Sequence, residues 1–298
     1  IANKKGQTLI HFAAVRGNME IVQMLIDDYA ADVNAQDNDG NTPLLLAAKN
    51  RKWEIVKMLI DKDSKNSADY KIANNDGLTL IHLAAEKGNK EIVQMLIDDY
   101  AADVNAQDND GNTPLLLAAK NREWEIVKML IDKDSTYSAD YKVANKKGRT
   151  LIHFAAKRGN KVIVQVLIDD YAADVNVQDN DGDTPLLLAA KNRKWKMVKM
   201  LLVKDSKNSA DYKIANADGQ TLIHLAAIGG NMEIVQMLID DYTADVNVQD
   251  NNGNTPLLLA ASNCKWEMVK MLIDKDSKYS ADYKIANKKG QTLIHFAA

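Results

Sequence analysis

Hydrophobic residues in this chain fall into short paired segments with polar turns between them. In one such pair, residues 44–48 read Leu-Leu-Leu-Ala-Ala, and residues 53–60 place two isoleucines, a valine and a leucine on one face of a helix, with Glu54 and Lys57 outside. Thr42 followed by Pro43 predicts a helix start, because a threonine hydroxyl can cap free N–H groups and proline suits the first helical position. Thr8 is expected to cap the other kind of segment in the same way. The pattern predicts an all-α fold built of helix pairs.

The pairs repeat with a fixed period. The segment that begins at Ala2 returns every 71 residues without a gap, and glycines of a G-x-T motif divide each 71-residue unit at spacings of 34 and 37. The chain therefore consists of alternating odd and even modules. A fixed long period is typical of a solenoid, in which each module buries its apolar face by stacking on its neighbours. This architecture favours an elongated recognition surface over a catalytic pocket.

Both module types resemble the ankyrin repeat. Residues 6–14 read Gly-Gln-Thr-Leu-Ile-His-Phe-Ala-Ala, residues 40–48 read Gly-Asn-Thr-Pro-Leu-Leu-Leu-Ala-Ala, an I-V-x-x-L-I segment follows each, and Ala-Asp-Val-Asn at 31–34 joins the modules. Odd modules replace the motif proline with leucine, and even modules replace the motif histidine with leucine. Even modules also replace the mid-repeat glycine with Arg51, Arg122, Arg193 or Cys264.

The resemblance implies an ankyrin-repeat solenoid of stacked helix-turn-helix repeats with a finger loop between them. It covers the whole chain, as eight complete repeats and the first helix of a ninth. We expect one array over residues 1–298, with double units 2–72, 73–143, 144–214 and 215–285 and a partial unit 286–298. Neither end carries a polar capping repeat, so we also expect the chain to be a fragment of a longer protein.

Composition narrows the possible partners. The net charge of −3 means that the chain has no overall positive potential to attract nucleic acid or an anionic membrane. The sequence contains no run of 18 apolar residues, so it predicts no transmembrane helix. The single cysteine excludes an intrachain disulfide and favours a reducing compartment. We expect a cytoplasmic protein, or one in a host cytosol if it is a secreted effector.

Candidate catalytic and metal sites are weak in this sequence. The five motif histidines lie two modules apart, roughly 20 Å at ordinary helix spacing, so they cannot share a metal ion and should form hydrogen bonds within their repeats. The loop 35–46 lacks the first Asp and the twelfth Glu of a calcium-binding loop, because Ala35 and Leu46 stand there. The module that contains Cys264 has no histidine to activate the thiol as a nucleophile. The four tryptophans recur at the same position of the even modules, which favours a packing role over a binding role. The sequence predicts no enzyme activity, no cofactor and no metal.

Differences between the copies indicate a binding surface. The first two double units differ at eleven positions, seven of which fall in the finger loop and in the end of the first helix with the turn after it. In ankyrin arrays these regions line a concave groove that holds protein partners, so the resemblance implies a partner-specific surface on a fixed scaffold. Drift at exposed positions is the alternative, but it should also scatter changes over the outer face of the second helices.

The predicted partner-binding residues are the variable and charged positions of the fingers and of the first-helix ends. They are Lys4, Lys5, Gln7, Val15, Arg16, Met19, Asp39, Asn75, Asp76, Leu78, Glu86, Lys87, Lys90, Asp110, Lys146, Lys147, Arg149, Lys157, Arg158, Asp181, Asp218, Gln220 and Ile228. Odd fingers alternate between basic and neutral or acidic, which should set the register and choice of partner.

We therefore expect a non-enzymatic protein–protein interaction module that binds another protein, with no nucleic acid, membrane or metal. Two alternatives stay open. The array could be the targeting arm of a larger enzyme or host-directed effector, because both of its ends lack a capping repeat. Duplicated arrays rich in Lys, Asn, Ile and Asp also resemble those of AT-rich intracellular bacteria, which are often host-directed effectors. It could also serve as a scaffold or spacer.

Overall fold

The computed structural model describes residues 2–61, 66–132, 137–202, 209–274 and 280–297, and all regular structure in these ranges is helical. The chain divides into two compact units, Ile1–Lys146 and Lys147–Ala298. Each unit holds four helix pairs of the predicted kind, and the second unit also holds the beginning of a ninth repeat. The expected single array over residues 1–298 stays a prediction.

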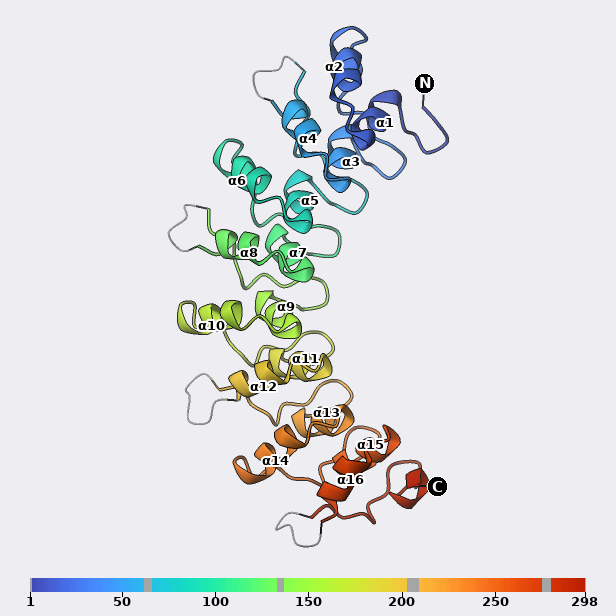
Figure 1. Ribbon diagram of the computed structural model, residues 1–298, viewed down its shortest axis with the longest axis vertical. Coiled ribbons are helices and arrows are strands. Elements are labelled where there is room, and N and C mark those ends of the chain that lie inside the picture. The colour runs from blue at the N-terminus through green and yellow to red at the C-terminus, as the bar shows by residue number, and fades with distance from the viewer. Residues whose placement is uncertain (1, 62–65, 133–136, 203–208, 275–279, 298) are drawn as a thin grey trace. The chain divides into compact units, whose positions relative to one another are not determined.

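The first unit is a stack of helix pairs (Figure 1). Its helices are α1 (Leu9–Arg16), α2 (Met19–Asp27), α3 (Pro43–Lys49), α4 (Trp53–Leu59), α5 (Leu80–Lys87), α6 (Lys90–Asp98), α7 (Pro114–Asn121) and α8 (Trp124–Leu130). The first helix of each pair packs on the first helix of the next, from α1 through α3 and α5 to α7, and the second helices form another row beside them.

The second unit repeats this arrangement. Its helices are α9 (Leu151–Arg158), α10 (Lys161–Asp169), α11 (Pro185–Lys191), α12 (Trp195–Leu201), α13 (Leu222–Gly229), α14 (Met232–Asp240), α15 (Pro256–Ser262), α16 (Trp266–Leu272) and α17 (Ile294–Ala297). The first helices α9, α11, α13, α15 and α17 contact one another in that order.

Helix starts follow the predicted capping chemistry. The Thr42 hydroxyl accepts a hydrogen bond from the backbone N–H of Leu45 at 3.2 Å, with Pro43 in the first helical turn. Thr8 also caps its helix, but through a capping box with His11, which takes the place usually held by Glu or Gln. Odd second helices begin at an asparagine, as at Asn18, whose side chain accepts from the N–H of Ile21.

The core of each unit lies between the two rows of helices. In the first unit, Leu44, Ala47, Ala48 and Val56 are fully buried, and Ile55 is 1% exposed. Buried alanine pairs in the first helices let neighbouring repeats approach closely. The helices are only seven to nine residues long, apart from the four-residue α17. Such short helices are marginal alone, so stability comes from stacking.

Even modules keep the backbone conformation of the glycine that they lack. Arg51, Arg122, Arg193 and Cys264 follow their first helices with φ between 54° and 69°, in the left-handed region where Gly88 serves the odd modules. The turn between the two helices therefore requires this left-handed backbone conformation, and each non-glycine residue adopts it at a cost of about 1 kcal/mol.

Candidate partner-binding surface

Nine finger loops precede the first helices of the described repeats, and in all of them except 145–149 the side chain of the first residue is shown to close the turn. They comprise residues 3–7, 37–41, 74–78, 108–112, 145–149, 179–183, 216–220, 250–254 and 287–291. In the second of them, Oδ1 of Asp37 accepts hydrogen bonds from the backbone N–H groups of Asp39 and Asn41 at 3.1 and 2.8 Å, and the N–H of Gly40 donates to the Asp37 carbonyl. Each finger is therefore a rigid tight turn.

A ladder of main-chain hydrogen bonds joins successive fingers within each unit. In the first unit, the N–H of Asn38 donates to the carbonyl of Lys5 at 2.9 Å, Asn75 to Asp39 at 2.9 Å, Asn109 to Asp76 at 2.8 Å, and Lys146 to Asp110 at 2.8 Å. The acceptors are carbonyls of residues whose side chains vary between copies. Because the ladder uses backbone groups alone, side chains on the fingers can change without loss of the scaffold.

The predicted residues divide into exposed and half-buried groups. Those exposed are Lys4, Lys5, Arg16, Met19, Asp39, Asn75, Asp76, Lys90, Asp110, Lys146, Lys147, Asp181 and Asp218. Those half-buried are Gln7, Val15, Leu78, Glu86, Lys87, Arg149, Lys157, Arg158, Gln220 and Ile228. One exposed residue also has a structural role, because the Asn75 side chain donates to the carbonyl of Asn38 at 3.0 Å.

In the first unit the structure brings finger and first-helix residues together. A hollow of about 230 Å³ is lined by Asp76, Leu78 and Asp110 from two fingers, by Glu86 from the end of α5 and by Lys120 from α7. Asp108 also lines it, so the hollow is predominantly acidic. Four of the predicted residues therefore share one concave site, as expected for a groove along fingers and first helices.

In the second unit two of the predicted residues neutralise each other. Nε of Arg149 lies 2.7 Å from Oδ2 of Asp179, and its Nη2 lies 3.2 Å from Oδ2 of Asp181. The Arg149 side chain is 16% exposed and that of Asp179 is fully buried. Arg149 thus forms a structural ion pair between adjacent fingers, a role that the variation between copies did not indicate.

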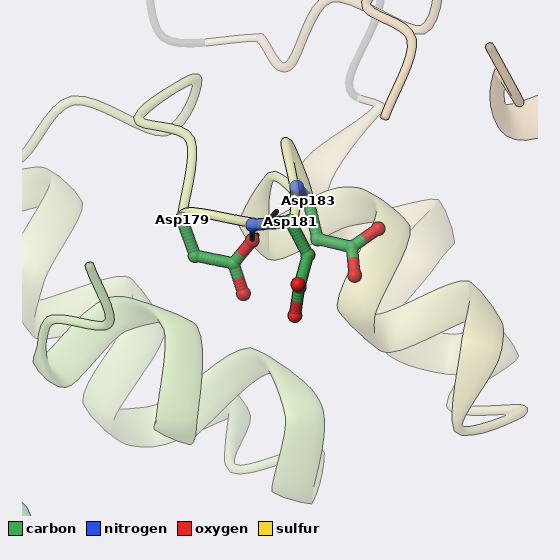
Figure 2. Close-up of side chains that lie close together, drawn as sticks. All are labelled: Asp179, Asp181 and Asp183. Carbon is green, nitrogen blue, oxygen red and sulfur yellow. Dashed lines mark hydrogen bonds between the residues drawn. The ribbon is translucent and has the colours of Figure 1, made fainter. Parts of the chain in front are cut away.

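Asp179, Asp181 and Asp183 cluster at this point (Figure 2), with carboxylate oxygens within 4.8 Å of one another. Lys191 Nζ lies 2.6 Å from Oδ1 of Asp183, so two cations face three carboxylates. At least one oxygen of each carboxylate is held in an ion pair. The absence of a metal site stays a prediction.

Sequence reasoning missed Asp183 and Lys191. A signal was present, because residue 183 is aspartate only in the third double unit, where the others have Asn41, Asn112 and Asn254. The same double unit has Arg149 where the others have glutamine or leucine. The two changes mark the same region of one copy, although Arg149 pairs with Asp179 and Asp181, and Asp183 pairs with Lys191.

Positive charge accumulates beside this cluster. Burial and the nearby cations Arg149, Arg158 and Lys147 lower the pKa of the Lys157 ammonium from its ordinary value. The equivalent position in the first unit, Glu86, is acidic. At this position the charge of the surface formed by fingers and first helices therefore differs between the second double unit and the third.

The motif histidines have a structural role, as the sequence predicts. Nδ1 of His82 accepts a hydrogen bond from the backbone N–H of Thr79 at 3.3 Å, and Nε2 lies 3.0 Å from the carbonyl of Ala106. An N–H group can only donate, so Nδ1 is the acceptor and Nε2 carries the proton. The rings of His11, His82, His153 and His224 thereby link their own helix starts to the loop that leads into the next repeat.

Acidification is expected to destabilise the protein through these rings. Burial lowers the pKa of His82, His153 and His224 below 6.5, so the unfolded chain binds more protons than the folded chain between the two pKa values. Their stabilising contribution is complete above the unfolded pKa and is lost as the pH falls towards the folded pKa. We expect the urea midpoint to be lower at about pH 5.5 than at about pH 7.5. The H82Q/H153Q/H224Q variant should show a smaller difference, and an unchanged or higher midpoint at acid pH in the parent would contradict this account.

The remaining sequence candidates show no further clustering. The Cys264 thiol is exposed, as expected. Trp53, Trp124 and Trp195 are half-buried and Trp266 is 41% exposed, so the tryptophans pack only partly against the repeats. Among the described residues, no helix has the length and apolar character needed to cross a lipid bilayer.

Comparison with known proteins agrees with the architecture. A sequence profile described as ankyrin repeats in three copies matches residues 1–70, 64–142, 136–213 and 206–284. The chain is 44% identical over 57 residues to Rabankyrin-5 of Mus musculus, which covers 19% of this chain and 5% of that protein.

Two further relatives come from a bacterium and a plant. An ankyrin repeat protein of Rickettsia bellii (strain RML369-C) is 41% identical over 66 residues, covering 22% of this chain and 37% of the relative. E3 ubiquitin-protein ligase XBAT33 of Arabidopsis thaliana is 39% identical over 62 residues, covering 20% and 12%. The aligned segments thus span well under two thirds of the relatives.

Proposed function

Because this chain belongs to the ankyrin repeat family, we propose that it binds a partner protein along its recognition surface, the surface formed by the finger loops and first helices. Ankyrin repeat domains are generally protein-interaction modules. The proposed role is non-enzymatic and cytoplasmic, and it requires no cofactor.

The observation that carries this proposal is variation on a fixed scaffold. Main-chain bonds hold the fingers, whereas exposed side chains change from Lys4 and Lys5 in one copy to Asn75 and Asp76 in the next. Between these two copies the second helices do not vary in the same way, because residues 20–27 and 91–98 are identical. Drift at exposed positions would have changed both surfaces.

The charge pattern supports a specific partner. Each unit has a charge pattern of its own, because Asp76 and Asp110 line an acidic hollow in the first and Lys157 lies near Arg149 and Arg158 in the second, so a partner of either unit needs complementary charge there. Complementary charge sets register and association rate more than affinity, whereas the rigid fingers keep the ordering cost of binding low.

Removing the finger cations is expected to abolish partner binding. We would immobilise the parent and the variant K4S/K5S/K146S/K147S, capture proteins from eukaryotic cytosol, and measure the dissociation constant of the captured protein. The variant should lose at least about tenfold in affinity while its thermal unfolding stays nearly unchanged, since exposed side chains contribute little to stability.

A matched control removes four exposed lysines outside the fingers. Lys71, Lys142, Lys213 and Lys284 lie beside the tyrosine that precedes each of them, 5.6 to 5.8 Å from the ring centroids. The K71S/K142S/K213S/K284S variant has the same charge change and should retain the partner. Equal retention by both variants, or no captured protein with the parent, would overturn the proposal.

A targeting arm of a larger enzyme is the second candidate. It is favoured by the similarity to an E3 ubiquitin-protein ligase, of which the aligned segment is only 12%. In that case the same recognition surface would select a substrate for a catalytic domain elsewhere in the polypeptide. Reading the complete open reading frame separates the two candidates, because only the second requires an enzyme domain in the same chain.

A further inference from the structure

The second unit contains a basic cleft outside the finger loops. It has a volume of about 830 Å³ and is lined by the turn between α9 and α10, the turn between α11 and α12, and the first residues of α12 and α14. Its cationic lining residues are Arg158, Lys161, Arg193, Lys194, Lys196 and Lys199, and Glu233 is its one carboxylate among them.

Two substitutions make this copy basic. Position 196 is lysine here, whereas the other double units have Glu54, Glu125 and Glu267. Position 162, which is 58% exposed, is valine here, whereas the others have Glu20, Glu91 and Glu233. Each change removes a carboxylate from the second residue of a helix, α10 or α12, and residue 196 lines the cleft, so the charge there is particular to the third double unit.

The loss of these carboxylates alters the local ion pairs. Elsewhere the glutamate pairs with the lysine three residues later, as in Lys128–Glu125 at 3.0 Å and Lys270–Glu267 at 2.9 Å. In the third double unit Lys196 stands three residues before Lys199, so this local pair is missing, and Lys199 keeps only the pair with Glu233, as the equivalent Lys57 pairs with Glu91 at 2.7 Å. Lys196 thus adds a positive charge to the cleft where the other copies place a negative one.

An aromatic ring forms part of the cleft wall. Trp195 lines it, and a Cβ at residue 229 would lie 2.6 Å from Cζ2 of that ring. Residue 229 is glycine only in the fourth double unit, where the others have Arg16, Lys87 and Arg158. A side chain at residue 229 would occupy the space of the Trp195 indole, and the glycine leaves that space open.

We propose that this cleft binds an acidic segment of a partner protein, in which clustered carboxylates or phosphates face the cationic lining. Recognition of acidic or phosphorylated peptides by arginine and lysine clusters is a recurrent binding mode. The volume suits a few residues. A long polyanion such as RNA would continue beyond it, where Glu233 and Glu267 replace the basic residues.

This inference goes beyond the recognition surface described above. The cleft lies at the turns and the beginnings of the second helices, and only Arg158 belongs to both sites. Loss of one binding activity therefore does not require loss of the other, and their variants can be tested separately.

The test uses the whole chain and a fluorescein-labelled peptide of six consecutive glutamates. The V162E/K196E variant restores residues that the other copies carry, so it should fold as the parent does. We expect saturable binding of the peptide by the parent, weakened by salt, and at least about tenfold weaker binding by V162E/K196E. The milder variant K161M, which restores the residue of Met19 and Met232, should fall between them.

Controls separate the charge class of the ligand. The K71E/K213Q variant has the same total charge change away from the cleft and should bind like the parent, and a six-glutamine peptide should not bind. Unchanged peptide binding by V162E/K196E, binding of the glutamine peptide, or no peptide binding by the parent would overturn the proposal. Binding of hexauridylate or phosphatidylserine vesicles in place of the peptide, with the same sensitivity to V162E/K196E, would assign the cleft to another class of ligand and likewise overturn it.

Discussion

Replacing Gly77 by alanine is expected to destabilise the first unit by about 2–4 kcal/mol. Gly77 has φ of +78°, and a Cβ at this position would lie 2.7 Å from both the backbone nitrogen and Oδ1 of Asn109. That nitrogen donates the ladder bond to the carbonyl of Asp76 at 2.8 Å. The methyl group therefore adds backbone strain and also separates two fingers. Urea unfolding followed by tryptophan fluorescence measures the loss.

Gly88 provides a matched control eleven residues later in the same repeat. Its φ of +82° imposes the same strain on alanine, but the added Cβ would meet the end of the Glu123 side chain, which can move. We expect G88A to cost about 1 kcal/mol. Equal losses for G77A and G88A would show that the ladder contributes nothing beyond the strain of the left-handed conformation.

Replacing Asp179 by alanine is expected to cost about 3–5 kcal/mol. The Oδ1 atom of Asp179 accepts hydrogen bonds from the backbone N–H groups of Asp181 and Asp183 at 3.0 and 2.9 Å, and Oδ2 pairs with Arg149. Alanine leaves two N–H groups and a largely buried guanidinium without their shared carboxylate. The free energy of unfolding of the second unit, measured by urea titration, should fall accordingly.

Substitutions of Arg149 and Asp183, which surround Asp179, should lower the free energy of unfolding by less. R149Q restores the residue found at Gln7 and Gln220, and Gln7 still reaches Oδ2 of Asp37 at 3.4 Å. D183N restores the asparagine of the other copies, in which Lys49 donates to Oδ1 of Asn41 at 2.6 Å. We expect each to cost less than half as much as D179A. A loss for R149Q as large as that for D179A would assign the stability to the ion pair instead of to the closed finger.

Most of the fold could be predicted from the sequence because each repeat is encoded locally. Thr42 and Pro43 set a helix start, alanine pairs mark close packing, and Ile55 and Val56 mark the buried face. The histidine role could also be predicted, because rings two repeats apart can only bond within their neighbourhood. The capping box with His11 was harder to predict, because it depends on a side-chain rotamer as well as on the spacing of the residues.

The candidate site was predictable only in part. Exposure of Lys4, Lys5 and Asp76 followed from variation on a repeated scaffold. The pairing of Arg149 with Asp179 and Asp181 could not be predicted in this way. Arg149 lies 30 and 32 residues before these aspartates, in the preceding finger, and the repeat pattern gives no information about contacts between fingers. The basic cleft also depends on a three-dimensional coincidence, in which residues 158–161, 193–199 and 231–233 face one space.

The central claim is that main-chain bonds fix the fingers and that the order of their side chains selects the partner. Its most direct test exchanges the variable finger residues of the first two double units, in the variant K4N/K5D/Q7L/N75K/D76K/L78Q. Composition and net charge are unchanged, and position 75 receives the residue found at Lys146. With the partner captured by the parent, the account predicts at least about tenfold weaker binding and nearly unchanged thermal unfolding. An unchanged dissociation constant would contradict it, because binding would then not depend on which finger carries which side chain.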